Sequence, residues 1–151
     1  MDDTMNNPHI IVGSQLGATE YVADEIEQWL SDNNITATIH TSPDLNDIPT
    51  ENAHWILCTS THGAGDLPDN IEPFYQQLND QQPNLNSVKC WLIGIGDTSY
   101  DTYNQAAKTF QQRLISLNVQ LQDHTFIDVL SDDLPETIAL SWFKRTNFLD
   151  P

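Results

Sequence analysis

Short apolar runs alternate with amphipathic segments along this chain. Five runs have the length and composition of β-strands, and they cover residues 9–12, 35–40, 55–58, 88–95 and 119–130. In the segments between them, apolar residues recur every three or four positions, which predicts helices. The predicted apolar helix faces are Ala18, Val22, Ile26 and Leu30; Ile71, Phe74, Tyr75 and Leu78; and Tyr103, Ala106, Ala107, Phe110, Leu114 and Leu117. Pro135 opens a last helix.

The order of these elements is β-α-β-β-α-β-α-β-α, with the helix after the second strand missing or reduced to a turn. Apolar strands that alternate with helices predict an α/β fold in which a parallel sheet is covered on both faces. Asp69 and Glu72 have the spacing of a capping box, so we expect Asp69 to begin the second helix. Sheets of this kind bind ligands beyond the carboxyl ends of their strands. Three loops are predicted at that edge, at residues 13–19, 59–69 and 94–104.

The first of these loops, residues 13–19, joins a strand to a helix N-terminus, where backbone N–H groups and the helix dipole favour an anion. Ser14 and Thr19 add hydroxyl donors. No Lys follows as in a Walker A loop, and the glycine pattern of dinucleotide folds is absent. Because residues 1–88 contain no Lys or Arg, this loop would have to bind phosphate by hydrogen bonds alone. The alternative is an ordinary turn capped by Ser14.

The second and third loops have the residues of a flavin clamp. Gly63 and Gly65 permit backbone conformations closed to other residues, including a peptide that turns over at low cost. This suits a flavin, whose N5 gains a proton on reduction. His62 and Tyr100 could cover the two ring faces, and Asp97 could accept a hydrogen bond from N3–H of the ring. Each residue also has a plainer interpretation, as a solvated loop histidine or as packing at the start of a helix.

The three loops together resemble those of flavodoxins. Gly-Ser-Gln-Leu-Gly-Ala-Thr at 13–19 is similar to the flavodoxin phosphate loop. Thr-His-Gly-Ala-Gly-Asp-Leu-Pro-Asp-Asn at 61–70 is similar to the second flavin loop of flavodoxins and of diflavin reductases, and Gly-Ile-Gly-Asp-Thr-Ser-Tyr at 94–100 is similar to the third. In detail, the residues at 60–70 most resemble the MioC group of short flavodoxin-like proteins. The resemblance covers most of the chain.

This resemblance implies FMN as the cofactor and a three-layer sandwich whose five-stranded parallel sheet has the order 2-1-3-4-5. It implies an FMN-binding domain over residues 9–148, and the acidic, polar composition of residues 1–8 predicts a short disordered lead before it. The implied phosphate contacts are Ser14, Gln15, Leu16, Gly17, Ala18 and Thr19, and the implied ring contacts are Thr61, His62, Gly63, Asp97, Tyr100 and Tyr103.

Three positions depart from the family pattern. His62 stands where many flavodoxins have Trp or Tyr, which weakens stacking on one ring face. Leu16 and Ala18 replace a hydroxyl residue and an Asn, so two phosphate donors are lost. We therefore expect FMN to bind less tightly than in a typical flavodoxin.

The charge narrows the choice of partners. With 22 acidic and 5 basic residues, the formal net charge is −17. Such a field repels nucleic acid and anionic membranes and steers the protein towards basic partners, although it could equally serve solubility or salt tolerance. The spacing of the five His residues predicts no metal site. Without a signal peptide or bilayer-spanning run, we expect a cytoplasmic monomer.

Three functions fit these features to different degrees. We favour an electron carrier, without catalytic residues of its own, that takes electrons from a basic NADPH-dependent flavin reductase and passes them to an iron–sulfur or haem enzyme. The alternative is an FMN-dependent quinone or nitro-group reductase, against which the lack of an added substrate loop counts. The third possibility is a binding or signalling module that has lost its flavin. A receiver domain has the same topology, but Gly13, Ser14 and Gln15 stand where that class needs clustered acids.

Overall fold

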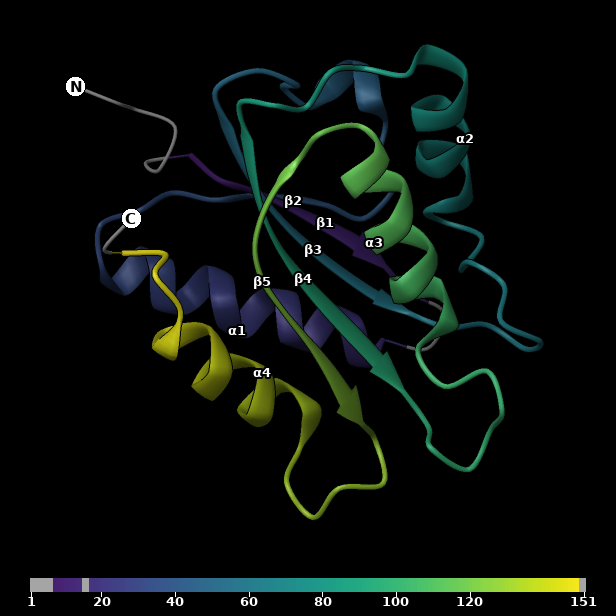
Figure 1. Ribbon diagram of the computed structural model, residues 1–151. Coiled ribbons are helices and arrows are strands. Elements are labelled where there is room, and N and C mark those ends of the chain that lie inside the picture. Colours follow the sequence, from purple (N-terminus) through teal and green to yellow (C-terminus); the bar gives the residue numbers. More distant parts are fainter. Residues whose placement is uncertain (1–6, 15–16, 150–151) are drawn as a thin grey trace.

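The central sheet of the computed structural model has five parallel strands in the order β2-β1-β3-β4-β5 (Figure 1). The structure describes residues 7–14 and 17–149. In chain order, the elements are β1 (His9–Gly13), α1 (Ala18–Asp32), β2 (Thr38–His40), the short 3-10 helix η2 (Leu45–Asp47), β3 (Ala53–Ser60), α2 (Glu72–Gln81), β4 (Val88–Gly96), α3 (Gln105–Ser116), β5 (Gln120–Asp128) and α4 (Pro135–Arg145). The predicted α/β fold and strand order are confirmed, and η2 stands where a turn was expected in place of a helix.

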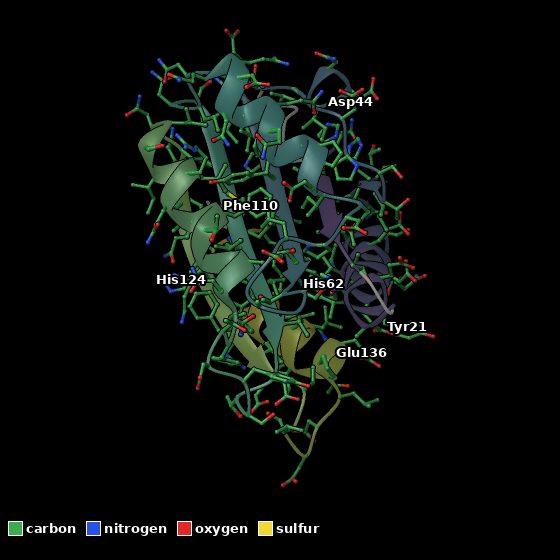
Figure 2. The ribbon with its side chains drawn as sticks, turned by 90° about the vertical axis from the view of Figure 1, so that its right-hand side faces the viewer. Tyr21, Asp44, His62, Phe110, His124 and Glu136 are labelled. Atoms are coloured by element: carbon green, nitrogen blue, oxygen red, sulfur yellow. The ribbon has the colours of Figure 1, made fainter. Side chains whose placement is uncertain are left out.

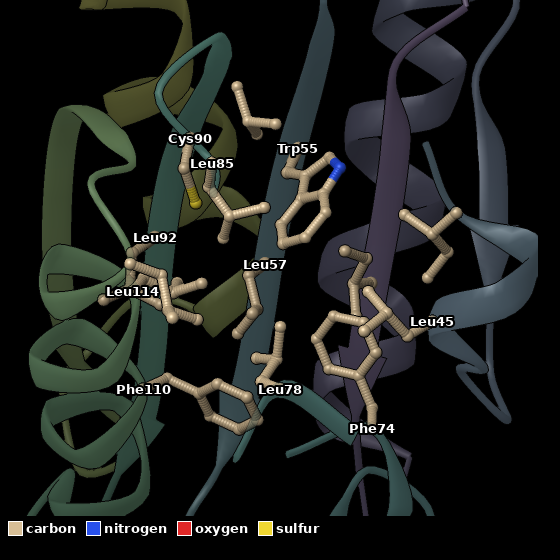
Figure 3. Packing of buried hydrophobic residues seen from close by; sticks show 14 of the residues in the cluster. Leu45, Trp55, Leu57, Phe74, Leu78, Leu85, Cys90, Leu92, Phe110 and Leu114 are labelled. Carbon is tan, nitrogen blue, oxygen red and sulfur yellow. The ribbon is translucent and has the colours of Figure 1, made fainter. Parts of the chain in front are cut away.

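The helices cover both faces of this sheet. In Figure 2 the helices α2 and α3 lie in front of the strands, whereas α1 and α4 lie behind them. Along β3, Trp55 and Leu57 pack towards α2 and α3, and Ile56 and Cys58 pack towards α1 and α4. Figure 3 shows the first of these two clusters, in which Trp55 and Leu57 meet Phe74 of α2. Both faces of the strand are apolar because both are covered.

Two predicted helix starts are corrected by the structure. The helix α2 begins at Glu72, and the prediction that Asp69 caps it is wrong. The N–H groups of Ile71 and Glu72, which such a cap would bind, donate instead to the carbonyl of Pro68. Tyr103 precedes α3 because Asn104 adopts a left-handed conformation with φ 55°. Both corrections arise from backbone turns that helical periodicity does not report.

Two other expectations concern the N-terminal lead and membrane-spanning helices. The predicted lead over residues 1–8 lies mostly outside the described residues, and its last two residues contact β2: Thr38 donates to the Asn7 side chain and to the Pro8 carbonyl. No helix in the described ranges is long and apolar enough to cross a lipid bilayer.

His9 and His40 lie side by side where β1 pairs with the edge strand β2. His9 Nδ1 is 2.9 Å from His40 Nε2, and the ring centroids are 5.1 Å apart. Burial lowers the pKa of His9, and the charge of His40 lowers it further. Burial also lowers the pKa of His40, an effect that Asp47 partly offsets. The folded protein therefore favours a pair that is not fully protonated.

We expect this pair to make the fold sensitive to mild acid. Because the unfolded chain takes up protons near pH 6.5 while the folded pair resists them, the free energy of unfolding should decrease as the pH falls below about 6.5. His40→Gln keeps a hydrogen-bonding group without a titrating charge, so it should flatten this dependence between neutral and mildly acidic pH. Urea unfolding at two pH values measures the slope. The same change at His124, an exposed residue of β5, should leave the slope as it is; an unaltered slope in His40→Gln would contradict the account.

Candidate functional site

A cavity of about 350 Å³ opens at the carboxyl edge of the sheet. The loops that follow β1, β3, β4 and β5 all contribute to its wall. Eight of the residues proposed from the sequence line it: Ser14, Ala18, Thr19, Thr61, Gly63, Asp97, Tyr100 and Tyr103. The structure thus gathers the three predicted loops around one cavity.

Four other proposed residues have different positions. Gln15 and Leu16 lie outside the described residues. Gly17 is the N-cap of α1, with a positive φ of 88° that suits glycine. The cavity lining does not include His62, whose backbone closes a small turn with Asp66: each of the two N–H groups donates to the other's carbonyl at 2.8 Å.

The start of α1 has the geometry of an anion site. The Gly17 N–H donates to Ser14 Oγ at 3.1 Å, which shapes the loop and leaves the Ser14 O–H proton available to a ligand. Thr19 is fully buried, and its Oγ1 has no hydrogen-bond partner among the residues that the structure describes. A buried hydroxyl without a partner is costly, so its position on the cavity wall indicates a polar ligand. Among the described residues that line the cavity there is no Lys or Arg.

The second loop is tied to the start of α3. Thr61 Oγ1 accepts a hydrogen bond from the Ala106 N–H at 3.1 Å. The carbonyl of Gly63 accepts one from Thr102 Oγ1 at 3.3 Å, and Gly63 itself has a positive φ of 46°. These bonds hold the loop after β3 against the loop after β4, so that both contribute to the same wall.

Carboxylates organise the third loop. Asp97 Oδ1 accepts hydrogen bonds from the N–H and the hydroxyl of Ser99, at 2.8 and 2.6 Å. Thr98 donates through its hydroxyl and its N–H to Asp128 at the end of β5. The hydrogen bond from the Thr98 side chain is the main cause that lowers the pKa of Asp128. The loop that presents Tyr100 is thereby fixed to the end of β5.

Asn104 is a site residue that sequence reasoning did not single out. It is fully buried on the cavity wall, and its side chain packs against the last residues of β4. A Cβ at Gly94 would lie 2.7 Å from Asn104 Oδ1, and a Cβ at Gly96 would lie 3.1 Å from it. Neither Oδ1 nor Nδ2 makes a hydrogen bond of ordinary geometry to any residue in the described part of the chain. Burial raises the pKa of Tyr103, and the adjacent Asn104 side chain partly lowers it. The sequence feature that points to this position is the pair Gly94 and Gly96, which leaves room for the Asn104 side chain.

Five further lining residues were also not predicted: Ser60, Ile95, Gly96, Thr102 and Val129. Most stand at strand ends or within loops that the sequence did identify, but their direction depends on the backbone. Val129 was assigned to the last strand, whereas β5 ends one residue earlier and leaves Val129 at the cavity.

The family model for flavodoxin matches residues 10–142. The protein MioC of Escherichia coli K12 is 38% identical over 134 residues, which cover 88% of this chain and 90% of that protein. Among solved structures, a point mutant of flavodoxin from Pseudomonas aeruginosa superposes with a TM-score of 0.82 at 28% identity, covering 91% of this chain and 94% of the other. The sulfite reductase [NADPH] flavoprotein alpha-component of Thiocapsa roseopersicina is 30% identical over 113 residues, 74% of this chain but only 22% of that protein.

These matches and the site define the class of protein, an α/β flavoprotein. The chain belongs to the flavodoxin family, whose cofactor is FMN. Within that family it is similar to MioC, as the loop at 60–70 suggested.

The cavity fits FMN on three counts. Its volume of about 350 Å³ lies within the range of cofactor pockets. The unpartnered hydroxyl of Thr19 lies at a helix N-terminus, where a phosphate is favoured. The buried amide of Asn104 also lies on the cavity wall, by the other two loops, where a ring with polar edges would meet it.

Tyr100 offers a direct check of this arrangement. It lines the cavity yet is 65% exposed, as expected for an aromatic side chain whose face is open for stacking on the flavin ring. Tyr100→Leu should weaken FMN binding about twofold to tenfold, because an aromatic pair is worth about 0.5–1.5 kcal/mol beyond area burial. Quenching of FMN fluorescence measures the dissociation constant. Tyr21, which is 62% exposed and projects outward from α1 (Figure 2), is the matched control; equal losses in Tyr21→Leu and Tyr100→Leu would contradict the assignment.

Proposed function

We propose that this protein is an FMN-dependent electron carrier without substrate chemistry of its own. The observation that carries the proposal is the size and position of the cavity. Its volume of about 350 Å³ is in the range of pockets that bury one cofactor, it lies at the sheet edge where α/β folds bind their ligands, and the chain belongs to the flavodoxin family. FMN supplies one- and two-electron redox chemistry when bound, and the protein orients and tunes it.

We propose two groups of contacts to the cofactor. The phosphate is held at the start of α1 by Ser14, Gln15, Leu16, Gly17, Ala18 and Thr19, and the ring by Thr61, His62, Gly63, Asp97, Tyr100 and Tyr103. The buried hydroxyl of Thr19 and the position of Tyr100 support this division. Neutral hydrogen-bond donors suit this phosphate site because the first 88 residues contain no Lys or Arg.

The surface beside the cavity supports docking of redox partners. Tyr100, Val129, Leu130 and Leu134 are large apolar residues that are between 40% and 65% exposed. Acidic residues are their neighbours in sequence, including Asp101, Asp132, Asp133 and Glu136. Exposed apolar side chains interspersed with acidic residues favour a partner whose own site combines apolar residues with Lys and Arg.

We propose as electron donor a basic NADPH-dependent flavin reductase and as acceptor an iron–sulfur or haem enzyme. The relative from Thiocapsa roseopersicina is the flavoprotein component of an NADPH-dependent sulfite reductase, and the matched region is a small part of it. In that protein the matching region therefore belongs to a larger NADPH-dependent flavoprotein. A separate chain of this kind would receive its electrons by docking.

The proposed setting is the cytoplasm, with the protein as a monomer. Cys58 and Cys90 are free and buried, as is usual in a reducing compartment. Burial raises the pKa of the Cys90 thiol to about 12, so neither disulfide exchange nor metal binding is favoured there. A net charge of −17 opposes self-association.

Reconstitution distinguishes a carrier from an enzyme. Loaded with FMN, the protein should oxidise NADPH only when a separate NADPH-dependent flavin reductase is added, and it should then speed the reduction of cytochrome c. Because docking is electrostatic, added salt should slow this transfer. Steady NADPH oxidation by the loaded protein and a quinone, without the reductase, would instead establish a quinone reductase.

A further inference from the structure

Asn70 bonds to two segments that follow neighbouring strands, the one after β1 and the one after β2. The Ser14 N–H donates to Asn70 Oδ1 at 2.9 Å. Asn70 Nδ2 donates to the carbonyl of Val12 at 2.7 Å and to that of Thr41 at 2.9 Å. A single amide therefore joins the end of β1, the segment after β2 and the approach to α2.

This amide takes the place of a missing peptide group in the sheet. The pairing of β1 with β2 runs from His9 and Thr38 to Ile11 and His40, where β2 ends. If the register continued, residue 42 would lie opposite Gly13, and its peptide group would bond to the Val12 carbonyl and the Ser14 N–H. The Asn70 side chain bonds to these two groups instead. It completes the sheet at the residue where the phosphate loop begins.

The consequence concerns the direction in which the loop leaves β1. Gly13 is already tightly enclosed, since a Cβ there would lie 2.4 Å from Thr59 Oγ1. Asn70 fixes the next residue by holding its N–H, and Ser14 in turn accepts the Gly17 N–H that begins α1. The hydroxyls of Ser14 and Thr19 therefore depend on Asn70 for their positions.

We infer that Asn70 is a positioning residue for the phosphate of FMN. It does not line the cavity, and it acts by fixing Ser14, which with Thr19 is among the proposed phosphate contacts that do line it. The inference rests on the proposed assignment of residues 14–19 to the phosphate. It separates recognition of the phosphate from recognition of the ring, which the loops after β3 and β4 provide.

The test compares FMN with riboflavin, which has the same ring but no phosphate. In Asn70→Ala, we expect the dissociation constant of FMN to rise by about tenfold or more, because several hydrogen bonds that hold the loop are lost. That of riboflavin should change less than about twofold, and the phosphorus NMR signal of bound FMN should shift. Gln77→Ala is the matched control, since Gln77 is also an amide that accepts a backbone N–H, from Leu45, and donates to Asp44, but on α2 and η2.

Each result decides a separate question. Equal weakening of FMN and riboflavin in Asn70→Ala, or the same FMN loss in Gln77→Ala, would reduce Asn70 to a general structural role and overturn the inference. If the unmodified protein did not prefer FMN to riboflavin, the phosphate assignment itself would fail. Asn70→Ser keeps one hydroxyl for the loop and is measured in the same way should Asn70→Ala not fold; it should lose FMN affinity selectively.

Discussion

Replacing Thr19 with Val should weaken FMN binding by about tenfold to a hundredfold while leaving the apoprotein at least as stable. The two side chains have nearly the same shape, so the change removes little more than a hydroxyl. In the described structure that hydroxyl is buried on the cavity wall without a partner. A hydrogen bond to a charged phosphate is worth about 1.5–3 kcal/mol, and an unsatisfied buried hydroxyl costs about 1–3 kcal/mol.

The prediction is specific because the affinity for FMN should fall while the stability of the apoprotein should not. Thermal unfolding of the apoprotein gives the change in stability, and titration with FMN gives the change in affinity. Thr137→Val is the control, because Thr137 lies in the first turn of α4 and is exposed. If Thr19→Val lowered both apoprotein stability and FMN affinity, the hydroxyl would have a structural partner and the phosphate assignment would be contradicted.

The second large effect is expected at Gly94 of β4. A Cβ at this position would lie 2.7 Å from the Cβ of Ala107, 2.7 Å from Asn104 Oδ1 and 3.0 Å from Phe126 Cδ1. These neighbours belong to α3, to the residue before it and to β5, so the methyl group would separate a helix from the sheet. We expect Gly94→Ala to lower the free energy of unfolding by about 2–3 kcal/mol and to displace Asn104 from the cavity wall.

Gly63→Ala provides the comparison for Gly94→Ala. A Cβ at Gly63 meets no atom within 4 Å, although its φ of 46° is unfavourable for Ala. This variant should lose only about 1 kcal/mol, the cost of a left-handed backbone. Urea unfolding of the two apoproteins checks the difference, and equal losses would show that the packing of α3 on β4 is looser than described.

The layout of the fold could be predicted because it depends on local patterns. Apolar runs mark the central strands, and small residues after β1, β3 and β4 mark the ligand edge, so the three loops were placed correctly. Helix starts were less predictable, since Pro68 rather than Asp69 satisfies the first N–H groups of α2. That choice depends on the direction of the chain before the helix, which periodicity does not contain.

Residues that act through distant contacts could not be found from the sequence. Asn70 reaches Thr41 and Val12, which are 29 and 58 positions away in the chain. Asn104 was read as the end of a motif, and only its burial against Gly94 and Gly96 places it on the cavity wall. His62 illustrates the converse, because the motif named it whereas the cavity lining in the described structure does not include it.

The central claim is that the cavity at the carboxyl edge of the sheet holds one FMN and uses it to carry electrons. An absorption spectrum of the purified protein, titrated with FMN and then with dithionite, tests this claim most directly. The account predicts saturable binding of one FMN with shifted absorption bands, followed by reduction in two resolved one-electron stages. No binding at micromolar FMN, or binding without any shift of the bands, would contradict it.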